Sequence, residues 1–110
     1  MGKRNQPEVQ AIERAVDYAG KLETALERVG NKGLTEKTSC RVNALSMGIY
    51  LFLITGWTYG GKVSKPIYKK VIGLFEEAKK VLDGDYKMWV GERVSDIKRM
   101  ARRYQPELAA

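Results

Sequence analysis

The amino-acid sequence predicts an all-α fold, a small bundle of about four helices that spans residues 1–110 as a single domain. In three long segments, apolar residues recur at steps of three and four, which is the period of one helix face. Short stretches rich in glycine, proline or serine separate these segments and supply turns. A chain of 110 residues matches one domain and allows a small apolar core.

The first helix is expected to begin at Pro7, because proline suits the first turn of a helix. Its apolar face would consist of Val9, Ile12, Val16, Ala19, Leu22, Leu26 and Val29. Gly30 is expected to end the helix as a left-handed residue, so that "GNKG" forms the turn.

The next segment, "VNALSMGIYLFLITGWTYGG", carries no charge between Arg41 and Lys62. Its length is near that of a bilayer span, but only residues 49–54 are continuously apolar. A strand is the other alternative, yet no second strand candidate exists to pair with its backbone. We therefore expect a central helix over residues 36–55, apolar on nearly all sides because other helices surround it.

Thr35 is expected to cap this central helix, with Leu34 packing at its start. Gly56 is expected to break the helix, which leaves "WTYGGK" as a loop. Trp57 and Tyr59 in this loop have two alternatives: they pack back onto the core, or they protrude as a contact for a partner. They are the candidate partner contacts.

The third helix is expected to begin near Ser64 or Lys65, just before Pro66, and to end at Gly84. Its apolar face would consist of Ile67, Val71, Leu74, Phe75, Ala78, Val81 and Leu82.

The fourth helix is expected to begin with Asp85 as its cap and to end before Pro106. Its apolar face would consist of Tyr86, Trp89 or Val90, Val94, Ile97, Ala101 and Tyr104. The tail after Tyr104 is expected to be frayed.

Catalysis is not expected from this composition. The sequence has no histidine, which is the commonest general base and the commonest metal ligand. Cys40 is the single cysteine, and no histidine is present to activate it as a nucleophile. Neither a phosphate-binding glycine loop nor metal-ligand spacing occurs. We expect no enzyme activity, no cofactor and no metal. One cysteine and no secretory signal favour a cytoplasmic protein without a membrane partner.

The formal charge of +7 is unevenly placed. Residues 1–36 carry six basic and six acidic residues, whereas residues 37–110 carry 14 basic and 7 acidic ones. Such an excess suggests a polyanionic partner, with a solvated cationic face as the alternative. The candidate residues for binding the backbone of RNA or single-stranded DNA are Arg41, Lys62, Lys65, Lys69, Lys70, Lys98, Arg99, Arg102 and Arg103.

The last helix and the central segment resemble small helical subunits of CRISPR effector complexes, of Cascade type or Type III. The resemblance spans about residues 38–104. It lies in the apolar "NALSMGIYLFL" with an internal glycine and in the series Tyr86, Trp89, Glu92, Met100, Arg102, Arg103 and Tyr104. Trp89 and Glu92 are one residue closer than in that pattern, and position 99 is arginine where the pattern has an aromatic residue.

The resemblance implies a non-catalytic subunit of a nucleoprotein complex. Several copies would stack along the complex, and their basic faces would line the path of the nucleic acid. Two other classes remain open from the residues alone. One is an independent DNA-binding regulator or chromatin-type protein, and the other is an interaction module for an acidic partner.

Overall fold

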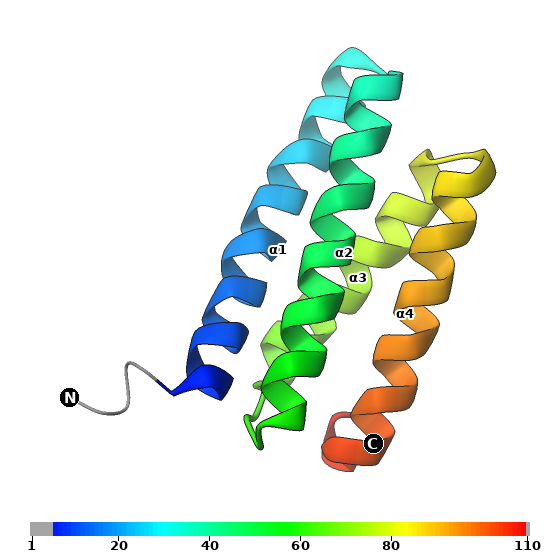
Figure 1. The fold of residues 1–110 in the computed structure, drawn as a ribbon. Helices are drawn as coiled ribbons and strands as arrows, with labels where there is room; N and C mark the ends of the chain where they lie inside the picture. The colour runs from blue at the N-terminus through cyan, green and yellow to red at the C-terminus, as the bar shows by residue number, and fades with distance from the viewer. Residues whose placement is uncertain (1–5, 110) are drawn as a thin grey trace.

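Four α-helices make up most of the chain in the computed structural model, which describes residues 6–109 (Figure 1). They are α1 (Pro7–Lys32), α2 (Glu36–Thr58), α3 (Lys65–Val81) and α4 (Gly84–Tyr104), and a 3-10 helix, η2 (Pro106–Ala109), follows them. No strand occurs in this part of the chain. The predicted all-α bundle is therefore confirmed.

The helices form two antiparallel hairpins, α1–α2 and α3–α4, whose turns lie at the same end of the bundle (Figure 1). α1 packs along α2, α2 along α4, α4 along α3, and α3 along α1. The bundle is thus a ring in the order α1, α2, α4, α3. Each hairpin buries the apolar faces that its own short turn brings together.

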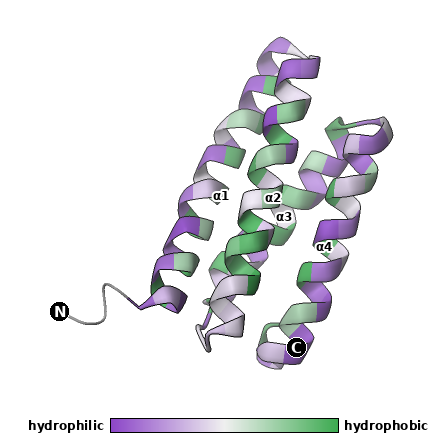
Figure 2. Cartoon of the chain, viewed as in Figure 1, coloured by the Kyte–Doolittle hydropathy of each residue, from purple (hydrophilic) through white to green (hydrophobic). Residues whose placement is uncertain are grey.

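Apolar side chains from all four helices form one continuous core. Ala15, Leu22, Ile49, Phe75 and Ile97 have no exposed surface. Figure 2 shows the apolar residues concentrated along α2, with hydrophilic residues covering much of α1 and α4. This pattern is the amphipathic arrangement that the residue spacing predicts.

α1 ends later than predicted. Gly30 lies within the helix, and the left-handed residue that ends it is Gly33, whose φ is 85°. The amide of Gly33 donates to the carbonyl of Val29 at 2.8 Å. The helix therefore reaches Lys32. Val16 was predicted to lie on the core face of this helix, but it is 39% exposed.

Thr35 caps α2 as predicted, in a reciprocal capping box with Thr38. The predicted break at Gly56 is wrong, because the helix continues to Thr58. Gly56 serves instead as a contact with α1, where a Cβ would collide with the side chain of Ile12. Gly48 plays the same role opposite the ring of Tyr18.

The prediction that other helices surround α2 is also wrong. Leu51 is 52% exposed and Met47 is 36% exposed, so one face of α2 meets solvent. Each helix of the ring has two main neighbours, and for α2 these are α1 and α4. None of the helices within residues 6–109 combines the length and hydropathy needed to cross a bilayer.

α3 ends at Val81 rather than at Gly84, and α4 begins one residue after Asp83, so Asp85 is not the cap. Gly84 is the first residue of α4 and has a φ of 54°, a backbone conformation that favours glycine. Val90, not Trp89, is the core residue of the two alternatives, with Trp89 38% exposed.

Arg93 joins α4 to α2 beneath the surface. Its Nη1 donates to the carbonyl of Asn43 at 3.0 Å, to Asn43 Oδ1 at 2.6 Å and to Ser46 Oγ at 2.8 Å. Burial lowers the pKa of the Arg93 guanidinium, while the charge of Glu92 opposes that effect. The three acceptors satisfy a cation that would otherwise be costly to bury.

Candidate nucleic-acid interface

Gln105 ties the end of α4 to the loop between α2 and α3. Its side-chain oxygen accepts hydrogen bonds from Val63 N at 2.9 Å and from Trp57 Nε1 at 3.0 Å. Its side-chain nitrogen donates to Val63 O at 2.7 Å. All three groups are buried, and Leu108 of η2 is only 5% exposed. The predicted fraying of the tail after Tyr104 is therefore wrong.

This connection brings together predicted site residues that lie some 40 positions apart in the sequence. Lys62 directly precedes Val63, and Arg102 and Arg103 lie shortly before Gln105. Burial raises the pKa of the Tyr68 phenol, and the positive charge of Arg102 opposes this rise. Tyr68 is near the start of α3, so this part of α3 is also close to Arg102. We call Lys62, Lys65, Lys69, Arg102 and Arg103 the basic end.

Several cations of the basic end have no carboxylate within ion-pair distance among residues 6–109. They are Lys62, Lys69, Arg102 and Arg103. Arg103 lies 5.6 Å from the ring centroid of Tyr104. Arg102 and Arg103 are in the last turn of α4, where cations complement the helix dipole, but Lys62 and Lys69 come from other segments and the dipole does not account for them. Together these cations suit phosphate groups.

Three other predicted residues are held by carboxylates. Lys70 pairs with Glu23 of α1 at 3.4 Å, and Lys98 pairs with Glu76 of α3 at 3.6 Å. Arg99 pairs with Asp96 at 2.8 Å. Lys70 therefore faces α1 rather than α4, and the nine predicted residues do not form one surface.

Glu76 lies between two lysines. Burial alone would raise the pKa of its carboxyl, but hydrogen bonds and charge from Lys79 and Lys98 outweigh this and lower the pKa. Glu76 therefore stays ionised and competes with any phosphate for Lys98.

The two candidate partner contacts have different surroundings. Trp57 belongs to α2 and is 2% exposed, so the alternative in which it protrudes is wrong. Tyr59 is 61% exposed and lies three residues from Lys62. An exposed tyrosine next to the basic end is suited to stacking on an unpaired base.

Arg41 belongs to a second surface, at the start of α2. The start of α2 and the end of α4 lie at opposite ends of the bundle (Figure 1). There Arg41 lines a groove of about 500 Å³ between α1 and α2, which we call the α1–α2 groove. Its lining residues are Asp17, Gly20, Lys21, Thr24, Ala25, Arg28, Lys37, Thr38 and Arg41.

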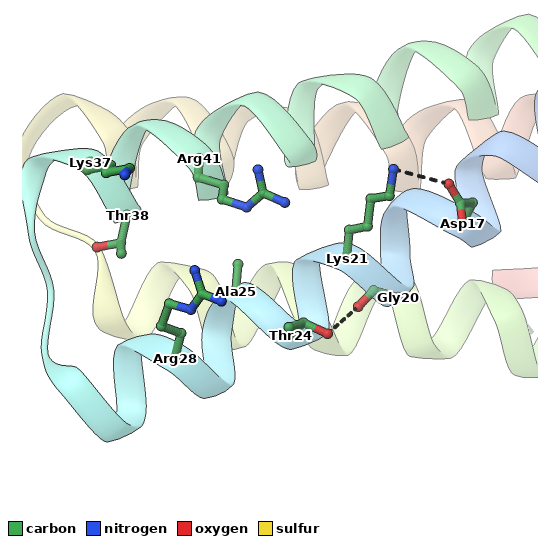
Figure 3. Close-up of a pocket in the computed structure, with 9 residues that line it drawn as sticks. All are labelled: Asp17, Gly20, Lys21, Thr24, Ala25, Arg28, Lys37, Thr38 and Arg41. Atoms are coloured by element: carbon green, nitrogen blue, oxygen red, sulfur yellow. Dashed lines mark hydrogen bonds and ion pairs between the residues drawn. The ribbon is translucent and has the colours of Figure 1, made fainter.

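Cations extend into this groove from both helices. Figure 3 shows Arg28 of α1 and Arg41 of α2 on opposite walls, with Lys37 near the turn. Lys21 pairs with Asp17 at 3.5 Å, and Asp17 is the one acidic residue of the lining. Arg28, Lys37 and Arg41 have no carboxylate within ion-pair distance in the described part of the chain.

Lys21, Arg28 and Lys37 were not predicted as site residues. The net charge of residues 1–36 is zero, but this sum does not show that three basic residues of α1 lie together on one face of the helix. Arg14, Lys21 and Arg28 recur at seven-residue steps, so they lie on one face of α1. That spacing is the signal in the sequence that could have revealed the groove.

A polar cluster of Glu36, Cys40 and Tyr86 lies between α2 and α4. Tyr86 OH donates to Glu36 Oε1 at 2.8 Å and lies 3.0 Å from Cys40 Sγ. Residues 6–109 contain no group of three or more histidine, cysteine or acidic side chains placed to hold a metal ion.

Comparisons of the chain with protein-family models, with curated proteins and with solved structures found no match. The two cationic surfaces, the basic end and the α1–α2 groove, are therefore interpreted from their own geometry.

Proposed function

We propose that the protein is a non-catalytic helical subunit that binds the phosphate backbone of RNA or single-stranded DNA at its basic end. The observation that carries this proposal is the hydrogen bonding of Gln105 to Val63, which fixes the loop that carries Lys62 to the end of α4 that carries Arg102 and Arg103. Guanidinium groups can grip phosphate oxygens in bidentate fashion.

The pairing of charges supports the same proposal. Carboxylates neutralise Lys70, Lys98 and Arg99, but Arg102 and Arg103 at the end of α4 have none nearby among residues 6–109. Like charges gathered without counter-charges repel one another in water. A polyanion would relieve this repulsion and release counterions, which favours binding.

The proposal is tested by fluorescence anisotropy with a labelled single strand of about 20 nucleotides at increasing salt. We expect affinity to fall steeply with salt and to depend little on sequence. Arg102→Gln/Arg103→Gln should weaken binding about tenfold or more at low salt. Lys80→Gln/Lys87→Gln is the matched control, because it removes the same charge from exposed positions at the α3–α4 turn.

Other outcomes would overturn the proposal in distinct ways. Sequence-selective binding to a duplex would favour an independent regulator. No binding even at low salt, together with capture of an acidic protein, would favour an interaction module.

For the cellular context, we propose a cytoplasmic CRISPR effector complex in which neighbouring copies stack. The support is the resemblance over residues 38–104, the small all-α bundle and the apolar central helix with Gly48 inside it. The neighbouring genes test this context, since absence of CRISPR effector genes beside the coding sequence would overturn it.

A further inference from the structure

The α1–α2 groove is a concentrated patch of positive charge outside the basic end. Four cations line it, from α1 and from α2, and Asp17 is the one acidic residue among the lining. Asp17 is already paired with Lys21. The remaining cations, Arg28, Lys37 and Arg41, lie on both walls of one hollow, so an anion there would be contacted from two sides.

Cations also recur along α1 beyond the hollow, where Arg14 lies beside Glu13 and Asp17. Arg14, Lys21 and Arg28 follow one another at seven-residue steps, about 10.5 Å each at the rise of an α-helix. The guanidinium of Arg14 lies 5.9 Å from the ring centroid of Phe52, so it too is directed toward α2. The row is about 21 Å long, which suits an extended polyanion better than a single small anion.

The groove is poorly suited to a protein helix. Stable protein interfaces centre on buried aromatic or large apolar anchors. The large apolar side chains that are exposed within residues 6–109 are Val16, Met47, Leu51, Tyr59, Met88 and Trp89, and none of them lines the groove. The apolar surface in the groove comes from Ala25 and the aliphatic stems of the long side chains rather than from large anchors, and the charged ends of those side chains suit a nucleic-acid backbone.

The groove runs between two packed helices, whose axes lie about 8–10 Å apart, so it is a hollow in the surface and not a gap between them. An extended single strand can lie along such a hollow with its phosphates within reach of cations from both helices.

We propose that the α1–α2 groove is a second binding site, which holds the phosphodiester backbone of single-stranded nucleic acid along α1. Arg28 and Arg41 grip phosphates from opposite walls, and Lys37 and Arg14 extend the site at either end. The proposal rests on the proposed function, because it names a second surface for the same class of ligand.

The test compares three double variants with the wild-type chain by anisotropy, using a labelled oligothymidylate of about 20 nucleotides. Arg28→Gln/Arg41→Gln removes the two groove arginines, both of which are exposed, so folding should be kept and is checked by circular dichroism. Arg102→Gln/Arg103→Gln removes the arginines of the basic end, and Lys80→Gln/Lys87→Gln is the control of equal charge.

We expect the groove variant to bind about tenfold or more weakly than the control variant at low salt, and the slope of log K against log salt to fall by about 1.4. A strand carrying photoreactive thymidine analogues should also crosslink to peptides of residues 17–41. Agreement of both measurements supports the groove site.

The failures are distinguishable. If the groove variant equals the control while the basic-end variant loses affinity, the groove site is overturned and the proposed function stands. If the wild-type chain binds no single strand, both are overturned. If polyglutamate of equal charge displaces the strand from the groove as well as an unlabelled strand does, the groove is not specific to phosphodiesters and the inference is overturned.

Discussion

The side-chain amide of Gln105 and the backbone of Val63 exchange two hydrogen bonds, at 2.9 and 2.7 Å, as two paired strands would. The same amide oxygen also accepts from Trp57 Nε1. One side chain thus satisfies three buried polar groups, one from Trp57 of α2 and two from Val63 in the loop that follows. The connection between α2 and α3 is fixed to the end of α4 by this contact.

Replacing Gln105 should therefore cost more stability than an average surface change. Gln105→Ala leaves the amide and carbonyl of Val63 and the Trp57 indole without partners, and we expect a loss of about 2–4 kcal/mol. Urea denaturation measures it. Gln105→Glu buries a carboxylate and places one of its oxygens against the Val63 carbonyl, so at neutral pH it should cost at least as much as alanine. An alanine variant within about 0.5 kcal/mol of wild type would contradict the assigned role.

Gly48→Ala should destabilise the α1–α2 contact. A Cβ at position 48 would lie 2.5 Å from Cδ2 and Cε2 of Tyr18, whose ring packs edge-on against Phe52. We expect a loss of about 1–3 kcal/mol in thermal or urea unfolding. Gly73→Ala is the control, because position 73 lies inside α3 with open space around it. There alanine should stabilise by up to about 1 kcal/mol.

Arg93→Lys should lower stability although the charge is kept. The Arg93 guanidinium reaches the Asn43 carbonyl and side chain and the Ser46 hydroxyl together. All three bonds come from Nη1, and the lysine side chain is shorter, so its ammonium stops short of this position and leaves at least one acceptor without a close donor, at a cost of about 1–3 kcal/mol. Unfolding of the lysine variant and of Arg99→Lys, an exposed arginine on the same helix, would be compared. Equal effects at the two positions would argue against this role for Arg93.

Glu76→Gln should strengthen binding to single-stranded nucleic acid. The carboxylate of Glu76 pairs with Lys79 at 3.3 Å and with Lys98 at 3.6 Å, and the substitution releases both lysines. We expect affinity to rise by about two- to fivefold at low salt, with little change at high salt. Glu77→Gln, which removes the same charge from the neighbouring exposed position, should have a smaller effect. If the two variants bind alike, direct competition at Lys98 is excluded.

The phenol of Tyr86 should ionise later than an ordinary tyrosine. Its hydrogen bonds with Cys40 and Glu36 raise its pKa above the usual value of about 10. Since the protonated phenol is favoured in the folded state, its contribution to stability is present below pH 10 and is lost as the pH rises through the folded pKa.

Phenolate absorbance measures this, as the difference between the alkaline titrations of wild type and Tyr86→Phe. Glu36→Gln should move the late component back toward pH 10, because it replaces a charged acceptor with a neutral amide oxygen and so removes one nearby negative charge. An unchanged titration in the Glu36 variant would show that this contact does not control the phenol.

Residue spacing predicted the helices well because each buries one apolar face, and that face is visible in the sequence. It placed the ends of the helices less well. Gly30 and Gly33 are equally good candidates for a helix end in isolation, and packing decides between them. A glycine such as Gly56 can end a helix, but here its lack of a side chain allows the close approach of α1.

The functional residues were predicted only in part. Periodicity of α3 cannot show that Lys70 meets Glu23, because that pair depends on which helices are neighbours. The groove is not visible in the net charge of residues 1–36, which is zero, because that sum does not distinguish one face of a helix from another. The contact of Gln105 with Val63 joins residues 42 positions apart and leaves no periodic trace in the sequence.

Cys40 is exposed, it is the single cysteine in the sequence, and it lies next to Arg41 in a hollow that also contacts Lys21. A thiol-reactive fluorophore or spin label would therefore attach at one position only, on α2 next to Arg41 of the α1–α2 groove. The native chain thus already carries a unique labelling site, from which the arrival of a strand could be followed in real time without engineering a cysteine.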